Sequence, residues 1–131
     1  MEFIQQNMAN ILVGLIFLVF LFRGTILGKI YGFENIKVPK LKEMLAEGNV
    51  KVIDVRGEGE FQSAHVPGSE CIPVHVLSSR CGELLKEHKD KDMVVICQSG
   101  NRSLSGAVTL KKAGFPKVYN VKGGMVAWSF S

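Results

Sequence analysis

Residues 93–103 read Met-Val-Val-Ile-Cys-Gln-Ser-Gly-Asn-Arg-Ser. The first four form a continuous apolar run, which is typical of a strand buried on both faces. A short loop containing Gly100 follows, and the apolar periodicity after it predicts a helix over 103–113 that is ended by Gly114 and Pro116. The stretch therefore predicts a strand, a tight loop and a helix in direct succession.

The same alternation continues on both sides of this stretch. Strands are predicted at 50–55, 71–74 and 118–121, and helices at 39–48, 60–64 and 76–88, with a last helical turn after Gly123 and Gly124. This order predicts an α/β fold with a doubly wound, mostly parallel sheet and helices on both faces. Sites in such sheets lie beyond the carboxyl ends of the strands, so residues 54–56 and 97–102 are the candidates.

Cys97 stands at the end of the predicted buried strand, directly before the loop. Backbone N–H groups of such a loop and the N-terminus of the following helix both stabilise an anion at the sulfur. Gly100 permits backbone angles that a Cβ would hinder, and Arg102 adds a permanent cation able to hold an oxyanion. The pattern indicates a nucleophile in an anion-binding cradle. The alternative is a buried cysteine that only packs at a strand end, beside a helix-capping loop.

Three blocks of sequence form an ordered pattern. The first is the loop Cys-x-x-Gly-x-Arg at 97–102. The second is Asp54-Val55-Arg56, Glu60-Phe61, His65-Val66-Pro67-Gly68 and Ile72-Pro73. The third runs from Gly114-Phe115 to Gly123-Gly124 and Trp128. Together these blocks resemble the rhodanese superfamily. Ala64, Ile96 and Val121 depart from the usual residues of that family without removing a chemical group. The likeness covers residues 36–131, and blocks in this order are a specific signal.

This resemblance implies a sulfurtransferase in which Cys97 takes a sulfane sulfur from thiosulfate or a persulfide and passes it to an acceptor thiol or cyanide. It implies substrate binding by the rest of the loop, namely Gln98, Ser99, Gly100, Asn101 and Arg102. Asp54, Arg56 and Glu60 are expected to form a supporting ion-pair network, and His65 a hydrogen-bonded turn rather than a base. No cofactor is implied.

Two other functions remain open. A phosphatase is disfavoured because only four residues separate Cys97 from Arg102, which leaves a narrow cradle. The domain could also be a membrane-tethered sulfur carrier or docking module with little free turnover.

Cys71 and Cys81 lack the spacing of metal ligands, so no metal site is expected. We expect both side chains to pack inside the domain. The alternative is that one of them forms a disulfide with Cys97 and so resolves a Cys97 persulfide.

The N-terminal segment is strongly apolar. Residues 3–22 carry no charge, and residues 11–22 are interrupted only by Gly14. We expect a tail at 1–7, a transmembrane helix at 8–27 with Arg23 reaching the headgroups, and a linker at 28–35. A cleaved signal peptide is the alternative, although basic residues before the run and a small-x-small site after it are missing. Basic residues follow the run, which predicts a single-pass protein of the cell membrane with its domain in the cytoplasm.

Composition agrees with a single domain behind one apolar segment. The chain has 131 residues, 47% of them apolar, three cysteines and a net charge of +4. Disorder, repeat arrays and a disulfide scaffold are excluded.

All acidic residues precede position 93, and five basic residues follow it. These lysines and Arg102 could steer anionic donors or face anionic lipid, or they could simply be solvated. Membrane lipid and a membrane protein are candidate partners, whereas no nucleic acid is expected.

Overall fold

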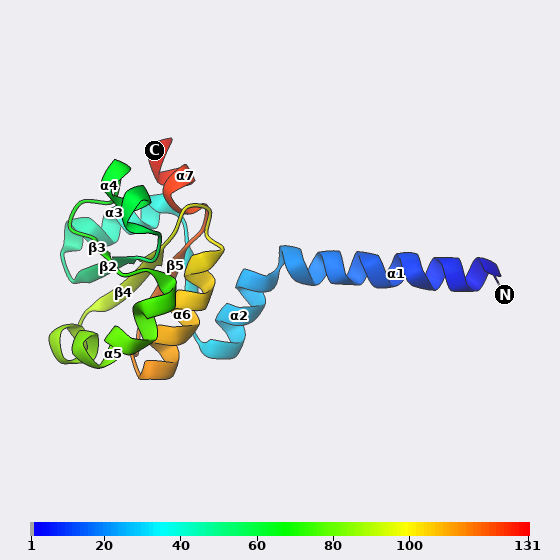
Figure 1. The fold of residues 1–131 in the computed structure, drawn as a ribbon, viewed down its shortest axis with the longest axis horizontal. Helices are drawn as coiled ribbons and strands as arrows, with labels where there is room; N and C mark the ends of the chain where they lie inside the picture. Colours follow the sequence, from blue (N-terminus) through cyan, green and yellow to red (C-terminus); the bar gives the residue numbers. More distant parts are fainter. Residues whose placement is uncertain (1) are drawn as a thin grey trace.

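The computed structural model describes residues 2–131, and its globular part is built around one parallel sheet (Figure 1). The sheet has the strand order β1-β5-β4-β2-β3. Its strands are β1 (Glu34–Ile36), β2 (Val50–Asp54), β3 (Glu70–Cys71), β4 (Asp92–Ile96) and β5 (Val118–Val121). Every neighbouring pair is parallel, so the carboxyl ends of all strands lie along one edge. The predicted doubly wound α/β fold is confirmed.

Seven helices connect and precede the strands among the described residues. They are α1 (Glu2–Leu21), α2 (Arg23–Tyr31), α3 (Val38–Glu47), α4 (Glu58–Ser63), α5 (Val74–His88), α6 (Arg102–Ala113) and α7 (Gly124–Ser129). One face of the sheet is covered by α2, α5 and α6, and the other by α3 and α7. The short helix α4 lies beside α7 near the carboxyl edge of the sheet (Figure 1).

The position of β4 at the centre of the sheet explains the apolar run in its sequence. Met93 and Val95 point into the cluster under α5 and α6, whereas Val94 and Ile96 point into the cluster under α3 and α7. All four side chains are inaccessible to solvent. A strand covered by helices on both faces has no polar side, and this is why its sequence shows no alternation.

Residues 28–35, which were expected to form a linker, lie mostly in a helix and a strand. Residues 23–31 form α2, which packs against α6 and ends at Gly32 with a left-handed backbone. Leu27 and Tyr31 pack against the core, and the neighbouring Phe33 is buried. Residues 34–36 form the edge strand β1. Residues 24–27, expected as the end of the membrane span, therefore lie against the domain.

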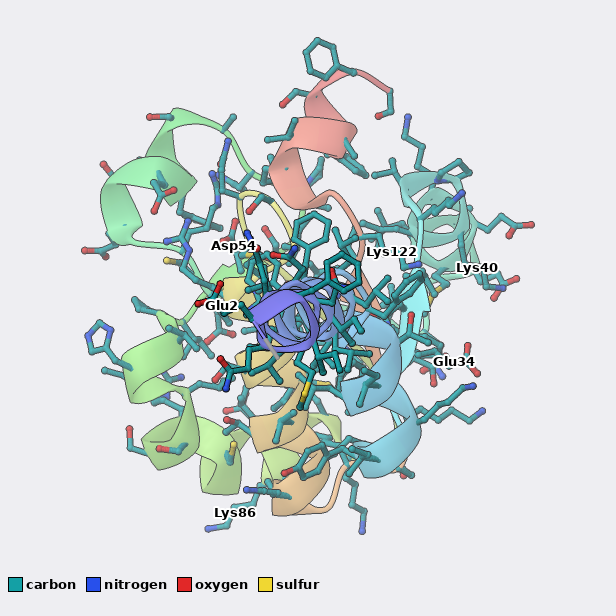
Figure 2. All side chains as sticks on the ribbon, turned by 90° about the vertical axis from the view of Figure 1, so that its right-hand side faces the viewer. Glu2, Glu34, Lys40, Asp54, Lys86 and Lys122 are labelled. Carbon is teal, nitrogen blue, oxygen red and sulfur yellow. The ribbon has the colours of Figure 1, made fainter. Side chains whose placement is uncertain are left out.

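Helix α1 stands out from the domain and touches little of it (Figure 1). Figure 2 looks along this helix from its N-terminal end, where Glu2 is labelled. Its side chains are exposed along the whole length, although most are apolar. Glu2–Leu21 is long and apolar enough to cross a membrane. A soluble core helix would be buried, whereas α1 has no buried residue.

Candidate active site

The sulfur of Cys97 lies in the loop that joins β4 to α6. The backbone N–H of Gly100 donates to Cys97 Sγ at 3.1 Å, and the Cys97 thiol lies 3.3 Å from Ser103 Oγ on the other side. Helix α6 begins at Arg102, so its partial positive charge is also at this loop. The cysteine is only 1% exposed. An amide donor and a helix N-terminus around a shielded sulfur suit a sulfur atom that carries negative charge.

The start of α7 holds this loop from the side. The backbone N–H groups of Met125 and Val126 donate to the carbonyl oxygens of Cys97 and Gln98, at 2.8 and 3.0 Å. The approach is close at Gly124, where a Cβ would lie 2.2 Å from the Cys97 carbonyl oxygen. Gly124 therefore allows the two backbones to meet, and α7 fixes the position of the nucleophile.

The remaining loop side chains face outward. Gln98, Ser99 and Asn101 are exposed, and Asn101 Nδ2 donates to Ser99 Oγ at 3.4 Å. Gly100 has a φ of +94°, in the left-handed region that favours glycine. That backbone angle turns the Gly100 N–H inward to the sulfur while the neighbouring side chains stay at the surface.

Asp54 and Arg56 form a buried pair beside the loop. Arg56 donates from Nε and Nη2 to both carboxylate oxygens of Asp54, at 2.8–3.1 Å. Its remaining donors reach the carbonyl of Ala64 at 2.6 Å and Oε1 of Gln98 at 3.1 Å. Arg56 is 3% exposed and Asp54 is fully buried. Removing one partner of such a pair leaves an uncompensated buried charge, so the pair ties α4 and the cysteine loop to β2.

Glu60 pairs with Arg102, although we expected it in the network of Asp54 and Arg56. The two carboxylate oxygens of Glu60 accept from Nη1 and Nη2 of Arg102, at 2.9 and 3.0 Å. The Arg102 guanidinium lowers the pKa of Glu60 from its ordinary value to about 2. The side chains of both residues are 42% exposed. A bidentate ion pair therefore spans the outside of the loop, between α4 and the first residue of α6.

His65 lies outside the cradle. Its Nδ1 is 2.7 Å from the carbonyl oxygen of Phe61, and its ring stacks on the Phe61 ring with centroids 3.9 Å apart. The hydrogen bond expected for this residue is present. The geometry holds the imidazole at the surface of α4, away from the sulfur.

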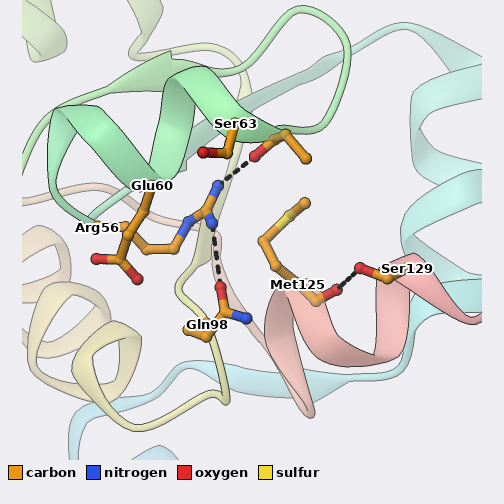
Figure 3. A pocket seen from close by; sticks show the side chains of 7 residues that line it. Arg56, Glu60, Ser63, Gln98, Met125 and Ser129 are labelled. Carbon is orange, nitrogen blue, oxygen red and sulfur yellow. Dashed lines mark hydrogen bonds between the residues drawn. The ribbon is translucent and has the colours of Figure 1, made fainter.

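A cavity of about 450 Å³ opens beside the cysteine loop (Figure 3). Its wall reaches the loop at Gln98, the neighbour of Cys97 in the sequence. Arg56 and Glu60 supply one positive and one negative group, and the other lining residues are Ser63, Ala64, Gln98, Met125 and Ser129. The cavity therefore has a lining of charged, polar and apolar groups, and it adjoins the loop that carries Cys97.

A sequence model of the rhodanese-like domain matches residues 37–131, which is most of the chain. The chain belongs to the rhodanese-like family. The resemblance expected from the three sequence blocks is therefore confirmed.

Relatives of this chain match the domain and, in one case, the region before it. Thiosulfate sulfurtransferase GlpE of Pseudomonas savastanoi is 37% identical over 90 residues, 69% of this chain and 82% of that protein. The uncharacterised protein YqhL of Bacillus subtilis is 34% identical over 122 residues, 92% of this chain and 94% of its own length. That match is longer than the rhodanese-like domain, so it includes residues before position 37.

Two further comparisons define the extent of the likeness. The chain spans only 44% of Bacillus subtilis YrkF, which is named as a sulfur carrier protein and is 38% identical over 84 residues. The human single-domain sulfurtransferase TSTD1 superposes with a TM-score of 0.66 at 25% identity, covering 74% of this chain and 96% of that structure. The family is that of rhodanese-like sulfurtransferases.

The other two cysteines of this rhodanese-like chain pack against backbone carbonyls. The Cys81 thiol donates to the Leu77 carbonyl at 3.3 Å, and the Cys71 thiol to the Arg56 carbonyl at 3.6 Å. Burial raises the pKa of both thiols. All three cysteines are free, and residues 2–131 hold no cluster of metal-ligating side chains.

Three residues of this rhodanese-like site were not singled out from the sequence. Gly124 belongs to a block that was recognised, but its contact with the Cys97 carbonyl is set by the fold. Ser103 and Asn120 are buried polar residues on the sulfur side of the loop, and Ser103 donates to Asn120 Oδ1. The signal available for Asn120 was a polar residue inside a predicted strand. Periodicity alone does not show what such a residue contacts.

Proposed function

We propose that this chain is a sulfurtransferase that moves a sulfane sulfur from thiosulfate or a persulfide donor to an acceptor thiol or cyanide, with Cys97 carrying the sulfur. The observation that carries this proposal is the contact of 3.1 Å between the Gly100 N–H and Cys97 Sγ, a sulfur that is itself shielded from water. The family of rhodanese-like sulfurtransferases supports the reaction class.

The transfer takes two steps in this proposal. The Cys97 thiolate attacks the outer sulfur of thiosulfate, the sulfur–sulfur bond of the donor breaks, and sulfite leaves with the bonding electron pair. The product is an anionic Cys97 persulfide. An acceptor thiolate or cyanide then attacks the outer sulfur, and Cys97 leaves as a thiolate. Covalent catalysis divides the reaction in this way, and the Gly100 N–H stabilises the negative charge on sulfur throughout.

The positive groups around the loop suit an anionic donor. Arg102 lies on its outer side and Arg56 lines the adjoining cavity, but each already has a carboxylate partner. The Asp54–Arg56 pair is buried and holds the scaffold, whereas the Glu60–Arg102 pair is half exposed and can open. Arg102 is therefore the cation that we expect to meet the sulfonate of thiosulfate, in competition with Glu60.

Glu60→Gln and Arg102→Ala should change donor binding in opposite directions. Glu60→Gln removes the carboxylate that occupies the Arg102 guanidinium, so the KM for thiosulfate falls by roughly threefold, in keeping with an exposed ion pair. Arg102→Ala removes the cation, so KM rises by about tenfold. Steady-state production of thiocyanate from thiosulfate and cyanide measures both changes.

Glu58→Gln is the matched control for this pair of variants. Glu58 lies on the same helix, is exposed, and makes no ion pair within residues 2–131. Glu58→Gln removes the same charge as Glu60→Gln, so its KM for thiosulfate should stay near that of the chain without substitutions. Equal effects of the two glutamine variants would mean that bulk charge acts on the donor, and that Arg102 is not the group that Glu60 restrains.

We further propose that α1 anchors the chain in the cell membrane as a single pass, with the domain on the cytoplasmic side. The exposed apolar surface of α1 supports this, as do the basic residues that follow it. Anchoring favours a second candidate function, in which the domain carries sulfur to a membrane protein and turns over slowly with free acceptors. The sulfur-carrier name of one relative supports that candidate.

Removal of residues 1–21 should release the chain from membranes while preserving the domain. The full chain should stay with the membrane pellet after alkaline carbonate extraction, and the shortened chain should be soluble, because it loses the apolar helix. The cut belongs before Arg23, since Leu27 and Tyr31 of α2 pack against the core. Intact mass distinguishes a retained anchor from a cleaved signal. Recovery of the full chain in the supernatant would contradict anchoring.

A further inference from the structure

A chain of polar contacts connects Cys97 to helix α2. The Cys97 thiol contacts Ser103 Oγ at 3.3 Å, and the Ser103 hydroxyl donates to Asn120 Oδ1. Asn120 Nδ2 donates to Asn35 Oδ1 at 2.9 Å, and Asn35 Nδ2 donates to the carbonyl oxygen of Gly24 at 2.9 Å. We call these contacts the polar relay. It begins at the nucleophile and ends in the helix that directly follows α1.

The fold brings these residues together from four elements. Asn35 of β1 and Asn120 of β5 are register partners in the parallel sheet, so their side chains lie side by side on one face. Ser103 is in the first turn of α6, and Gly24 is in the first turn of α2, which lies beside α6 (Figure 1). Ser103 is fully buried and Asn120 is 2% exposed. Polar groups buried this deeply need partners, and the relay supplies them.

The carbonyl of Gly24 sets the direction of the whole relay. A backbone carbonyl can only accept, so the Asn35 side chain must turn its Nδ2 toward it. Asn35 then presents Oδ1 to Asn120, which must donate through Nδ2 and presents Oδ1 to Ser103. The single proton of the Ser103 hydroxyl is therefore committed to Asn120, and an oxygen lone pair faces Cys97.

This direction matters because the sulfur changes its hydrogen-bonding character when it ionises. A thiol can donate to the Ser103 lone pair, whereas a thiolate needs donors. The Gly100 N–H supplies one donor on the loop side. Ser103 can supply a second only by withdrawing its proton from Asn120, which leaves the buried Asn120 Oδ1 unpaired at a cost. As it stands, the Ser103 hydroxyl offers the sulfur an acceptor and no donor.

We propose that Asn35 and Asn120 are positioning residues that link the Gly24 carbonyl of α2 to the Ser103 hydroxyl and so restrain the reactivity of Cys97. The proposal rests on the proposed function only in taking Cys97 as the reactive thiol. It makes the segment after the anchor a part of the active site: a shift of α2 that breaks the Gly24 contact frees the two amides to turn, and Ser103 can then donate to the thiolate.

The charged groups near Cys97 are the same with and without the relay. Arg102 of α6 is paired with Glu60 of α4, and Asp54 of β2 is paired with Arg56. Helix α7 carries no titratable side chain, and the β5 residue that faces α6 beside the cysteine loop is Asn120 itself. Asn35→Ala and Asn120→Ala leave these charged groups in place and add none, so their effect on the sulfur reports the relay.

Alkylation of Cys97 by iodoacetamide tests the proposal in the full chain, held in detergent micelles. The reagent reacts with the thiolate, and peptide mass mapping separates Cys97 from the other two cysteines. In Asn35→Ala the Asn120 amide can turn, and Ser103 can donate to sulfur. We expect the midpoint of the rate against pH to move down by about one pH unit, the effect of one charge-assisted hydrogen bond. Asn120→Ala should move it in the same direction.

Asn35→Asp is the control variant matched to Asn35→Ala. A carboxyl group at this position still accepts from Asn120 Nδ2, so Ser103 stays committed to Asn120 even though the Asn35 donor to Gly24 is replaced. Its midpoint should stay at or above the unchanged value. A midpoint that falls equally in Asn35→Asp and Asn35→Ala would show that loss of local structure is the cause, and would overturn the proposal.

Ser103→Ala provides a second test of the relay, because it removes the hydroxyl through which Asn35 affects the sulfur of Cys97. On this background, Asn35→Ala should add no further shift. The proposal is overturned if the shift persists without Ser103, or if Asn35→Ala alone leaves the midpoint unchanged or raises it. Failure of the proposed function would be seen in a different measurement. Cys97 would take up no sulfur from thiosulfate, whatever the alkylation profiles show.

Discussion

Cys97→Ser yields a folded chain that no longer takes up sulfur. Its hydroxyl is not ionised at neutral pH and forms no persulfide, so transfer from thiosulfate to cyanide falls by at least about 1,000-fold. The change is small in volume, and a serine oxygen can still accept from the Gly100 N–H. Intact mass after exposure to thiosulfate is the direct measurement: the unchanged chain gains one sulfur atom and the variant gains none.

Cys81→Ser is the control for this substitution. Cys81 is buried in α5 and donates to the Leu77 carbonyl, a contact that a serine hydroxyl can replace. The Cys81→Ser variant should still gain one sulfur atom and should keep most of the transfer rate. A sulfur gain that survives in Cys97→Ser would move the nucleophile to another cysteine. Phosphate release without thiocyanate production would instead favour the phosphatase alternative.

Gly124→Ala should uncouple α7 from the cysteine loop. The new Cβ would lie 2.2 Å from the Cys97 carbonyl oxygen and 2.8 Å from the Gln98 carbonyl carbon. Both are backbone atoms, so the loop or α7 must move, and the hydrogen bonds from Met125 and Val126 weaken. We expect a loss of about 2–3 kcal/mol in the free energy of unfolding. Displacement of the nucleophile should lower kcat by about 100-fold.

Gly48→Ala is the control that separates the steric clash of a new Cβ from the cost of placing alanine at a left-handed backbone angle. Gly48 ends α3 with a φ of +89°, and nothing lies within 4 Å of a Cβ placed there. This control should lose only about 1 kcal/mol of stability and keep its kcat. Urea unfolding and thiocyanate production measure both variants. If Gly124→Ala matched Gly48→Ala in both, the close approach of α7 would have no role in holding the loop.

Strands β2 to β5 and most helices of the domain could be predicted because their signals are local, whereas β1 lies mostly in the expected linker. The apolar run before Cys97 and the glycines after the helices act within a few residues. Helix α2 was not predicted as part of the domain. Its residues 23–27 were assigned to the end of the membrane span and the rest to the linker, and so short a helix is marginal by itself. Packing of Leu27 and Tyr31 against the core stabilises it.

The partner of Glu60 shows the same limit at the candidate site. Closeness in sequence favoured Arg56, but the buried Asp54 takes that guanidinium. Helix α4 then places Glu60 across the loop from Arg102, far away in the sequence. Ion pairs follow distance in space, so local spacing identified the right charged residues and the wrong pair.

The sequence by itself determined the order of strands and helices from α3 onward, the family, and Cys97 as the candidate nucleophile, because periodicity and loop motifs are written in neighbouring residues. The tertiary structure alone decided what surrounds the sulfur. The amides of α7 meet the loop only after the chain has crossed the sheet again, and Asn35 meets Asn120 only in the β1–β5 register. Contacts between residues this distant depend on the packing of the whole domain, which no local pattern records.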